Sequence, residues 1–160
     1  MRSRQRDLGV PQALEWIHEV VPGTLAVAQA ARMKVKEVPL MVLGDGRWRT
    51  PEPPDGITVR LLAPGDRALA ASGAVQYIGF GHPGTAVGDA GPAERDASAV
   101  GQSAVELDFL SDRIRNGLTL PAVAEDAGGV LAGGSHQPVG EVTAIVGVAT
   151  LPSARRRGLA

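Results

Sequence analysis

A chain of 160 residues is long enough to bury the core of one domain, or of one domain with a helical extension. Its 16 basic and 17 acidic residues leave a formal charge of -1, which excludes a global field that would draw the chain to nucleic acid or to an anionic membrane. Cysteine is absent, so disulfides, thiolate catalysis and cysteine-metal sites are excluded as well.

No segment resembles a targeting or membrane element. Met1 to Asp7 is basic, but no apolar stretch of signal-peptide length follows it. No apolar run approaches the roughly 20 residues that span a bilayer. The sequence therefore predicts a cytoplasmic protein that makes no membrane contact.

The first part of the chain has the pattern of a helical extension. Apolar residues in 11–21 fall mostly three or four apart, which predicts a short helix that begins at Pro11. A second helix is expected from Thr24, which would cap it, to Met33. Residues 38–43 form an apolar run that is expected to be extended.

A linker is expected next. Gly44 to Gly56 is rich in proline and glycine and has no period, which is typical of a linker or a surface loop. We therefore place a boundary near residue 50, with a helical extension and linker in 1–50 and the main domain in 51–160.

The main domain opens with a strand and a helix. Apolar residues alternate with polar ones from Ile57 to Leu61, which predicts a half-buried strand. Asp66 is placed to accept hydrogen bonds from the free amides of a helix that runs through 67–75 or slightly beyond. His82 to Pro92 is expected to be a mobile loop of the kind that often faces substrate.

One helix and three strands complete the domain. An apolar stripe from Val100 to Ile114 predicts a helix that Asn116 and Gly117 end. A turn at Asp126–Gly129 is expected between the first two strands. The expected strands are 118–125, 130–134 and 141–150. Together with Ile57 to Leu61 they predict an α/β chain of the α+β kind, with a mixed, mostly antiparallel sheet.

A short motif follows the last strand. Ser153 to Ala160 reads SARRRGLA, in which Arg155, Gly158 and Ala160 match the pattern Arg or Gln, two residues, Gly, one residue, Gly or Ala. This segment resembles motif A of the GNAT (GCN5-related) N-acetyltransferase superfamily. The order of elements before it is also that of the family. The resemblance covers Ile57 to Ala160, so residues 51–160 resemble the N-terminal part of a GNAT acetyltransferase domain.

The resemblance implies a function and a set of contacts. Members of the family transfer the acetyl group of acetyl-CoA to a primary amine by direct attack of the amine. The loop binds the cofactor's pyrophosphate through main-chain amides at a helix start, and the strand end binds pantetheine and polarises the thioester carbonyl. The positions that carry these contacts here are Val148, Ala149 and Thr150 in the strand and Arg155, Arg156, Arg157, Gly158, Leu159 and Ala160 in the loop.

The sequence departs from the family in three ways. Ala160 stands before the helix and strands that would complete the cofactor cleft, so the C-terminal half of the fold is expected to be absent. Ala144 occupies the position of the usual general-base glutamate, and neither Glu141 nor Glu125 is better placed. Tyr77 lies too early to match the family's acid. The catalytic residues are therefore unknown.

Several alternatives stay open. The chain is either an enzyme whose acceptor is unknown, a fragment of one, or an inactive CoA-binding or protein-interaction module with the same fold. The run from Arg155 to Arg157 also fits a solvated basic tail or a minor nucleic-acid contact. His18, His82 and His136 are expected on the surface or in loops, and no spacing suggests a metal. The expected partners are acetyl-CoA and an amine, without nucleic acid, and a homodimer is left open.

Overall fold

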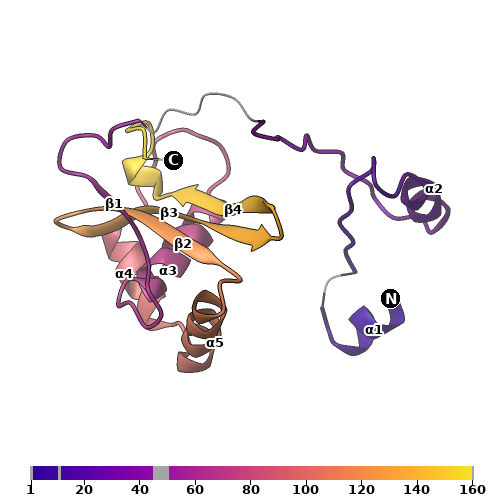
Figure 1. The fold of residues 1–160 in the computed structure, drawn as a ribbon, viewed down its shortest axis with the longest axis horizontal. Helices are drawn as coiled ribbons and strands as arrows, with labels where there is room; N and C mark the ends of the chain where they lie inside the picture. The colour runs from indigo at the N-terminus through magenta and orange to yellow at the C-terminus, as the bar shows by residue number, and fades with distance from the viewer. Residues whose placement is uncertain (1, 11, 45–50, 160) are drawn as a thin grey trace. The chain divides into compact units, whose positions relative to one another are not determined.

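The computed structural model describes residues 2–10, 12–44 and 51–159. They belong to two compact units, Met1–Trp48 and Arg49–Ala160, which Figure 1 shows as ribbons. Pro11, the expected first residue of a helix, lies outside the described residues, as does Ala160 of the motif. The same holds for residues 45–50, in which the sequence places its boundary.

The N-terminal unit contains two short helices, α1 Arg2–Asp7 and α2 Gly23–Ala30. The helix predicted over 11–21 is wrong, because the described residues 12–21 contain only a turn. The apolar side chains of that segment, such as Ile17, remain largely exposed. No packing therefore offsets the cost of nucleating so short a helix.

The second predicted helix is confirmed as α2, over a shorter range. It begins one residue before Thr24, so Thr24 does not cap it, and the main-chain amide of Thr24 donates to the carbonyl of Val21. The run expected to be extended at 38–43 forms no strand with the described chain, and its large apolar side chains are exposed.

The larger unit is built on one open sheet, whose strand order follows the chain. Its strands are β1 Thr58–Leu61, β2 Leu120–Asp126, β3 Gly129–Val139 and β4 Val142–Thr150. All three neighbouring pairs are antiparallel, so the α+β class is confirmed, while the described residues contain no parallel pair. The predicted turn joins β2 to β3, and the carboxylate of Asp126 accepts a hydrogen bond from the amide of Gly128.

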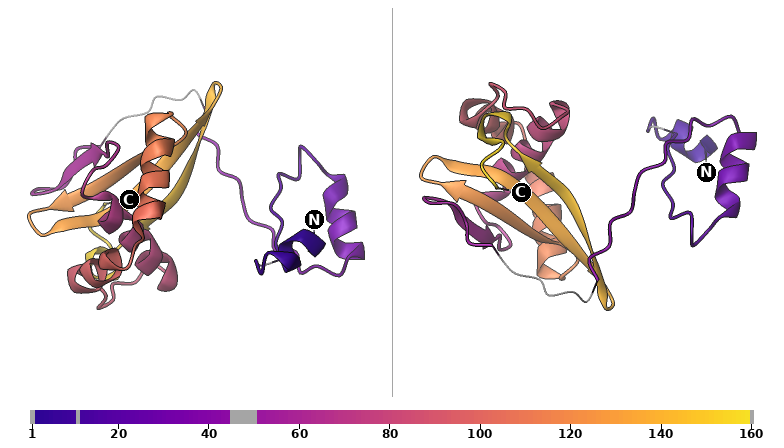
Figure 2. Two further views of the ribbon diagram at one scale, coloured as in Figure 1. Left: turned by 90° about the horizontal axis from the view of Figure 1, so that it is seen from below. Right: turned by 90° about the horizontal axis from the view of Figure 1, so that it is seen from above.

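Three helices lie on one face of this sheet: α3 Leu69–Gly81, α4 Pro92–Val100 and α5 Ala104–Arg115 (Figure 2, left). The sequence predicted α3 and α5 but placed Val100 at the start of the latter, whereas Val100 ends the separate helix α4 and is exposed. The missed boundary is a capping box, in which Ser103 accepts from the amide of Glu106 and the Glu106 carboxylate accepts from that of Ser103.

α3 ends at Gly81, six residues beyond Val75, whereas the sequence predicts an end at Val75 or slightly beyond it. Gly73 lies within α3 and allows close packing, because a Cβ there would lie 2.6 Å from the side-chain amide nitrogen of Gln102. Oδ1 of Asp66 accepts from the amide of Ala68 at 2.8 Å, but α3 begins only at Leu69 and has no side-chain cap, so Asp66 is not the helix cap that the sequence predicts. The guanidinium of Arg60 holds the pKa of the Asp66 carboxyl below its ordinary value.

Small and branched apolar side chains form the core between helices and sheet. Val75 of α3 and Leu151, just after β4, are fully buried, and Val123 of β2 lies between the layers. Within the described part of this unit, no helix lies on the opposite face of the sheet (Figure 2, right). Val59 and Leu61 on that face are more than half exposed, so the half-buried strand expected at the start of the domain is wrong for these two side chains.

No helix in the described part of the chain is both long and apolar enough to cross a membrane.

The side chain of Arg95, in α4, is hydrogen-bonded to the main chain of the β2–β3 turn. This side chain is buried, with Nη1 donating to the carbonyl of Val130 at 2.8 Å and Nη2 to that of Gly128 at 2.9 Å. Nε donates to the carboxylate of Asp96, which balances its charge. A buried guanidinium with these partners joins helix and hairpin in one fixed geometry.

We predict that Arg95→Met lowers the free energy of unfolding by about 2 to 3 kcal/mol, because two turn carbonyls lose their charged donor. Urea denaturation measures the effect. Arg67→Met is the matched control, since Arg67 is exposed, and it should change stability by less than about 0.5 kcal/mol. Equal losses in the two variants would contradict this role of Arg95.

Candidate anion-binding site at the end of β4

A β-bulge interrupts β4 three residues before its end. Gly133 of β3 pairs with Ala149 and Ser135 pairs with Val146, so Gly147 and Val148 together face a single residue of β3. Gly147 has φ +66°, the left-handed value typical of such a bulge. The bulge changes the direction of the strand, and the sequence analysis missed it. An isolated glycine within a strand pattern is the signal that could have indicated it.

The α3–α4 loop is bonded to the turn that follows β4. The amide of Gly88 donates to the carbonyl of Pro152 at 3.1 Å, and the amide of Ser153 donates to that of Ala90 at 3.0 Å. The 3₁₀ helix η1 Pro152–Ala154 forms this turn. The segment expected to be a mobile loop is thus a loop, but hydrogen bonds fix its second half.

Arg155 adds a side-chain link between the same two segments. Nη2 donates to the carbonyl of His82 at 2.6 Å and to that of Gly79 at 3.1 Å, and Nη1 donates to the carbonyl of Ala86 at 3.2 Å. The resemblance gave this arginine the role of charge beside an anion. In the structure its donors are directed at main-chain carbonyls, so its position is that of a brace.

The turn after Arg155 has two left-handed residues. Arg156 has φ +65° and Gly158 has φ +73°. The value at Arg156 costs roughly 1 to 2 kcal/mol for a residue with a Cβ, and such strain is often found at binding sites. Alternation of this kind turns successive amides toward one side and makes a concavity that suits an anion.

The amides of this turn have few acceptors. Within the described chain, no residue accepts a hydrogen bond from the amides of Gly158 and Leu159, while that of Arg155 donates to Pro152. No α-helix begins between Arg155 and Leu159, so the helix start implied by the resemblance is not found in the described residues. Any anion there would be held by the turn itself.

A cleft of about 540 Å³ lies between this turn, the end of β4 and the end of α3. It brings together seven of the nine residues predicted to bind cofactor, namely Val148, Ala149, Thr150, Arg155, Arg156, Gly158 and Leu159. Arg157 is exposed and is not part of its lining, and Ala160 is not described. The described lining contains arginines and one histidine but no carboxylate, which favours an anionic ligand.

A second, apolar hollow of about 350 Å³ lies on the open face of the sheet. Ile145, Leu120 and Val59 contribute to its lining. Val148 and Leu159 line both this hollow and the cleft, so the two are adjacent. A ligand held in the cleft by an anionic group therefore has an apolar surface within reach.

The residues that the sequence analysis considers as general base or acid lie outside the cleft. Ala144 and Glu141 are exposed near the far end of β4, and the carboxylate of Glu125 accepts from Arg60 Nε at 2.6 Å. Tyr77 is on α3, and its side chain is exposed. None of these residues lines the cleft.

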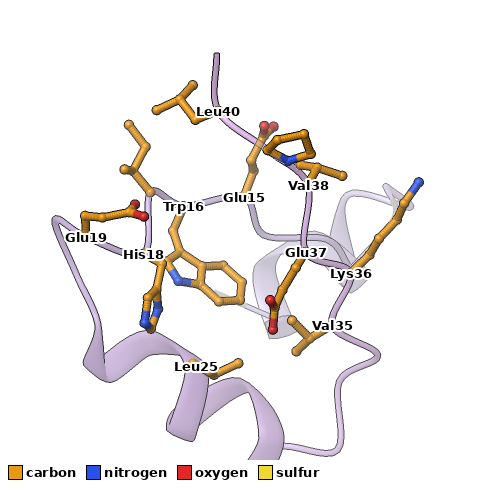
Figure 3. Close-up of a pocket in the computed structure, with 12 residues that line it drawn as sticks. Glu15, Trp16, His18, Glu19, Leu25, Val35, Lys36, Glu37, Val38 and Leu40 are labelled. Atoms are coloured by element: carbon orange, nitrogen blue, oxygen red, sulfur yellow. The ribbon is translucent and has the colours of Figure 1, made fainter. Parts of the chain in front are cut away.

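The N-terminal unit has a pocket of its own, of about 720 Å³ (Figure 3). Trp16 lies in it with His18 and Val35 close by, and its indole Nε1 is buried without a hydrogen-bond partner in the described chain. Glu15 and Lys36 also line the pocket, so both charges are present. The described residues contain no group of three His, Cys, Asp or Glu placed to hold a metal ion.

No protein-family model matches the chain, and no curated protein matches it either.

We predict that Arg155→Met loosens the α3–α4 loop, because three carbonyls lose a charged donor. Amide hydrogen exchange in residues 83–90 should become at least about tenfold faster. Arg157→Met is the matched control, since Arg157 is exposed and makes no hydrogen bond with the described chain. Unchanged exchange in Arg155→Met would show that the main-chain bonds hold the loop without the brace.

Proposed function

We propose that the cleft binds acetyl-CoA and that residues 51–160 form the N-terminal part of a GNAT-type N-acetyltransferase domain. The observation that carries the proposal is the turn at Arg156 and Gly158, whose left-handed residues and acceptor-free amides come after a bulged strand and the short 3₁₀ helix η1. A diphosphate is the part of coenzyme A that such a turn suits best.

The strand supplies the second contact of the proposal. β4 is an edge strand of the described sheet, so its outward main-chain groups have no strand partner. An extended pantetheine arm with two amides can pair with such an edge, in the way that a peptide adds to a sheet. The apolar hollow next to Val148 suits the uncharged end of the ligand.

The proposed reaction is direct attack of an amine on the thioester of acetyl-CoA. The nitrogen of a neutral primary amine attacks the thioester carbonyl carbon, the carbonyl oxygen becomes negative, and the C–S bond then breaks with its electron pair on sulfur. Main-chain N–H groups at the bulged end of β4, near Val148 to Thr150, are the proposed donors to that oxygen. Amide and free coenzyme A are the products.

A second candidate is a coenzyme-A-binding or interaction module without chemistry. The absence of a carboxylate from the described lining of the cleft favours it. Ala144, at the position of the usual general base, is exposed and does not line the cleft. Turnover separates the two functions, because an enzyme consumes acetyl-CoA in the presence of amines whereas a module binds it unchanged.

We predict that acetyl-CoA binds the chain in isothermal titration calorimetry, and that Gly158→Ala weakens binding at least about tenfold. The new Cβ strains a residue at φ +73° and partly covers the amides. Added salt should also weaken binding, because the attraction is partly between charges.

Gly140→Ala is the matched control for this experiment. Gly140 also has a left-handed φ, +59°, and open space at the position of a Cβ, but it lies in the β3–β4 turn. It should lose similar stability and keep its affinity for acetyl-CoA. If wild-type chain does not bind acetyl-CoA, or if both variants bind as wild type does, the proposal is wrong.

A further inference from the structure

His82 is the only residue in the described lining of the cleft whose side chain can act as a proton acceptor. The other charged groups of that lining are the guanidiniums of Arg155 and Arg156, which only donate hydrogen bonds. The sequence analysis treated His82 as one more loop histidine. The structure places it at the C-cap of α3, beside the end of β4.

The hydrogen bonds of His82 fix which ring nitrogen is free. Nδ1 lies 2.8 Å from the carbonyl oxygen of Ile78. A carbonyl oxygen only accepts, so this contact assigns the proton of the neutral ring to Nδ1. Nε2 then carries the lone pair, and no described residue donates to it. This is the tautomer that a proton acceptor needs.

The main chain of His82 is fixed as well. Its carbonyl oxygen accepts from Arg155 Nη2 at 2.6 Å, so the residue is joined to the turn that follows β4. Both the ring and the backbone are thus held relative to the proposed thioester site. A base must be positioned in this way before its basicity can be used.

We infer that His82 is the general base of the proposed acetyl transfer. The inference rests on the proposed function. As the N–C bond forms, Nε2 of His82 takes one proton from the attacking amine, and the tetrahedral intermediate then expels the thiolate of coenzyme A. The thiolate is protonated by solvent, and the imidazolium returns its proton to solvent, so charge and protons balance over one turnover.

Two segments place charged groups around His82. They are the turn, with the guanidiniums of Arg155 and Arg156, and α4, with the carboxylate of Glu94. The pKa of the Glu94 carboxyl is lowered chiefly by its hydrogen bond from the amide of Gly91, and to a smaller degree by His82. The neutral ring is needed for catalysis, so the rate should rise with pH as the ring loses its proton.

The test compares wild type with His82→Asn, whose side-chain amide can still donate to Ile78 but cannot act as a base. Acetyl transfer to benzylamine, spermidine and a peptide with a free N-terminus is followed by release of the coenzyme A thiol, while acetyl-CoA binding is measured separately. His82→Asn should bind acetyl-CoA within about twofold of wild type and lose at least about 100-fold in kcat/KM. The rise of rate with pH should disappear, and added imidazole should restore part of the activity.

His18→Asn is the control. His18 lies in the N-terminal unit and lines neither the cleft nor the apolar hollow. It should keep the wild-type rate and pH profile.

Any result other than the expected one contradicts the inference that His82 is the general base. A wild-type rate and pH profile in His82→Asn would remove His82 as the base and leave the proposed function standing. Loss of acetyl-CoA binding in that variant would make His82 part of the anion site instead. Wild-type chain that binds acetyl-CoA without turnover would favour the inactive module, and wild-type chain that does not bind it would remove function and inference together.

Discussion

The guanidinium of Arg155 donates to the carbonyls of Gly79, His82 and Ala86, and these bonds add to the main-chain bonds that join the walls of the cleft. They join the turn after β4 to the end of α3 and to the loop that follows it. A planar, permanently charged group with five donors suits this task, because it can satisfy several carbonyls at once in a fixed geometry. Because Arg155 is engaged in this way, the proposed binding of an anion falls to the main-chain amides beyond it.

The same end of the sheet combines two other constraints. The bulge at Gly147 redirects the last residues of β4, and α3 approaches so closely that a Cβ at Gly79 would lie 2.8 Å from that of Ala149. Polar and apolar surfaces meet there, since Val148 and Leu159 line both the cleft and the hollow on the open face. A ligand with an anionic part and an extended uncharged part fits such a junction, and acetyl-CoA has both.

Sequence patterns predicted the elements that depend on local chemistry. The β2–β3 turn at Asp126, the stop of α5 at Gly117 and the strand in β4 are as expected. Patterns failed where tertiary packing decides the structure, as in the helix expected over 11–21, where apolar side chains such as Ile17 stay largely exposed in the described chain. Seven predicted cofactor residues line one cleft. The hydrogen bonds of Arg155 join residues roughly 70 positions apart in the chain, and spacing in the sequence does not reveal them. The ring of His82 is held by a carbonyl one helical turn earlier, which spacing does not reveal either.

The most direct measurement of the central claim is a titration of ¹⁵N-labelled chain with coenzyme A, followed by amide resonances. Hydrogen bonds from main-chain N–H groups to a diphosphate should move the resonances of Gly158 and Leu159 downfield, with changes at Val148 to Thr150 along the strand edge. If these resonances stay in place, or if the changes gather around Trp16 in the N-terminal unit, then the turn after β4 does not hold the diphosphate.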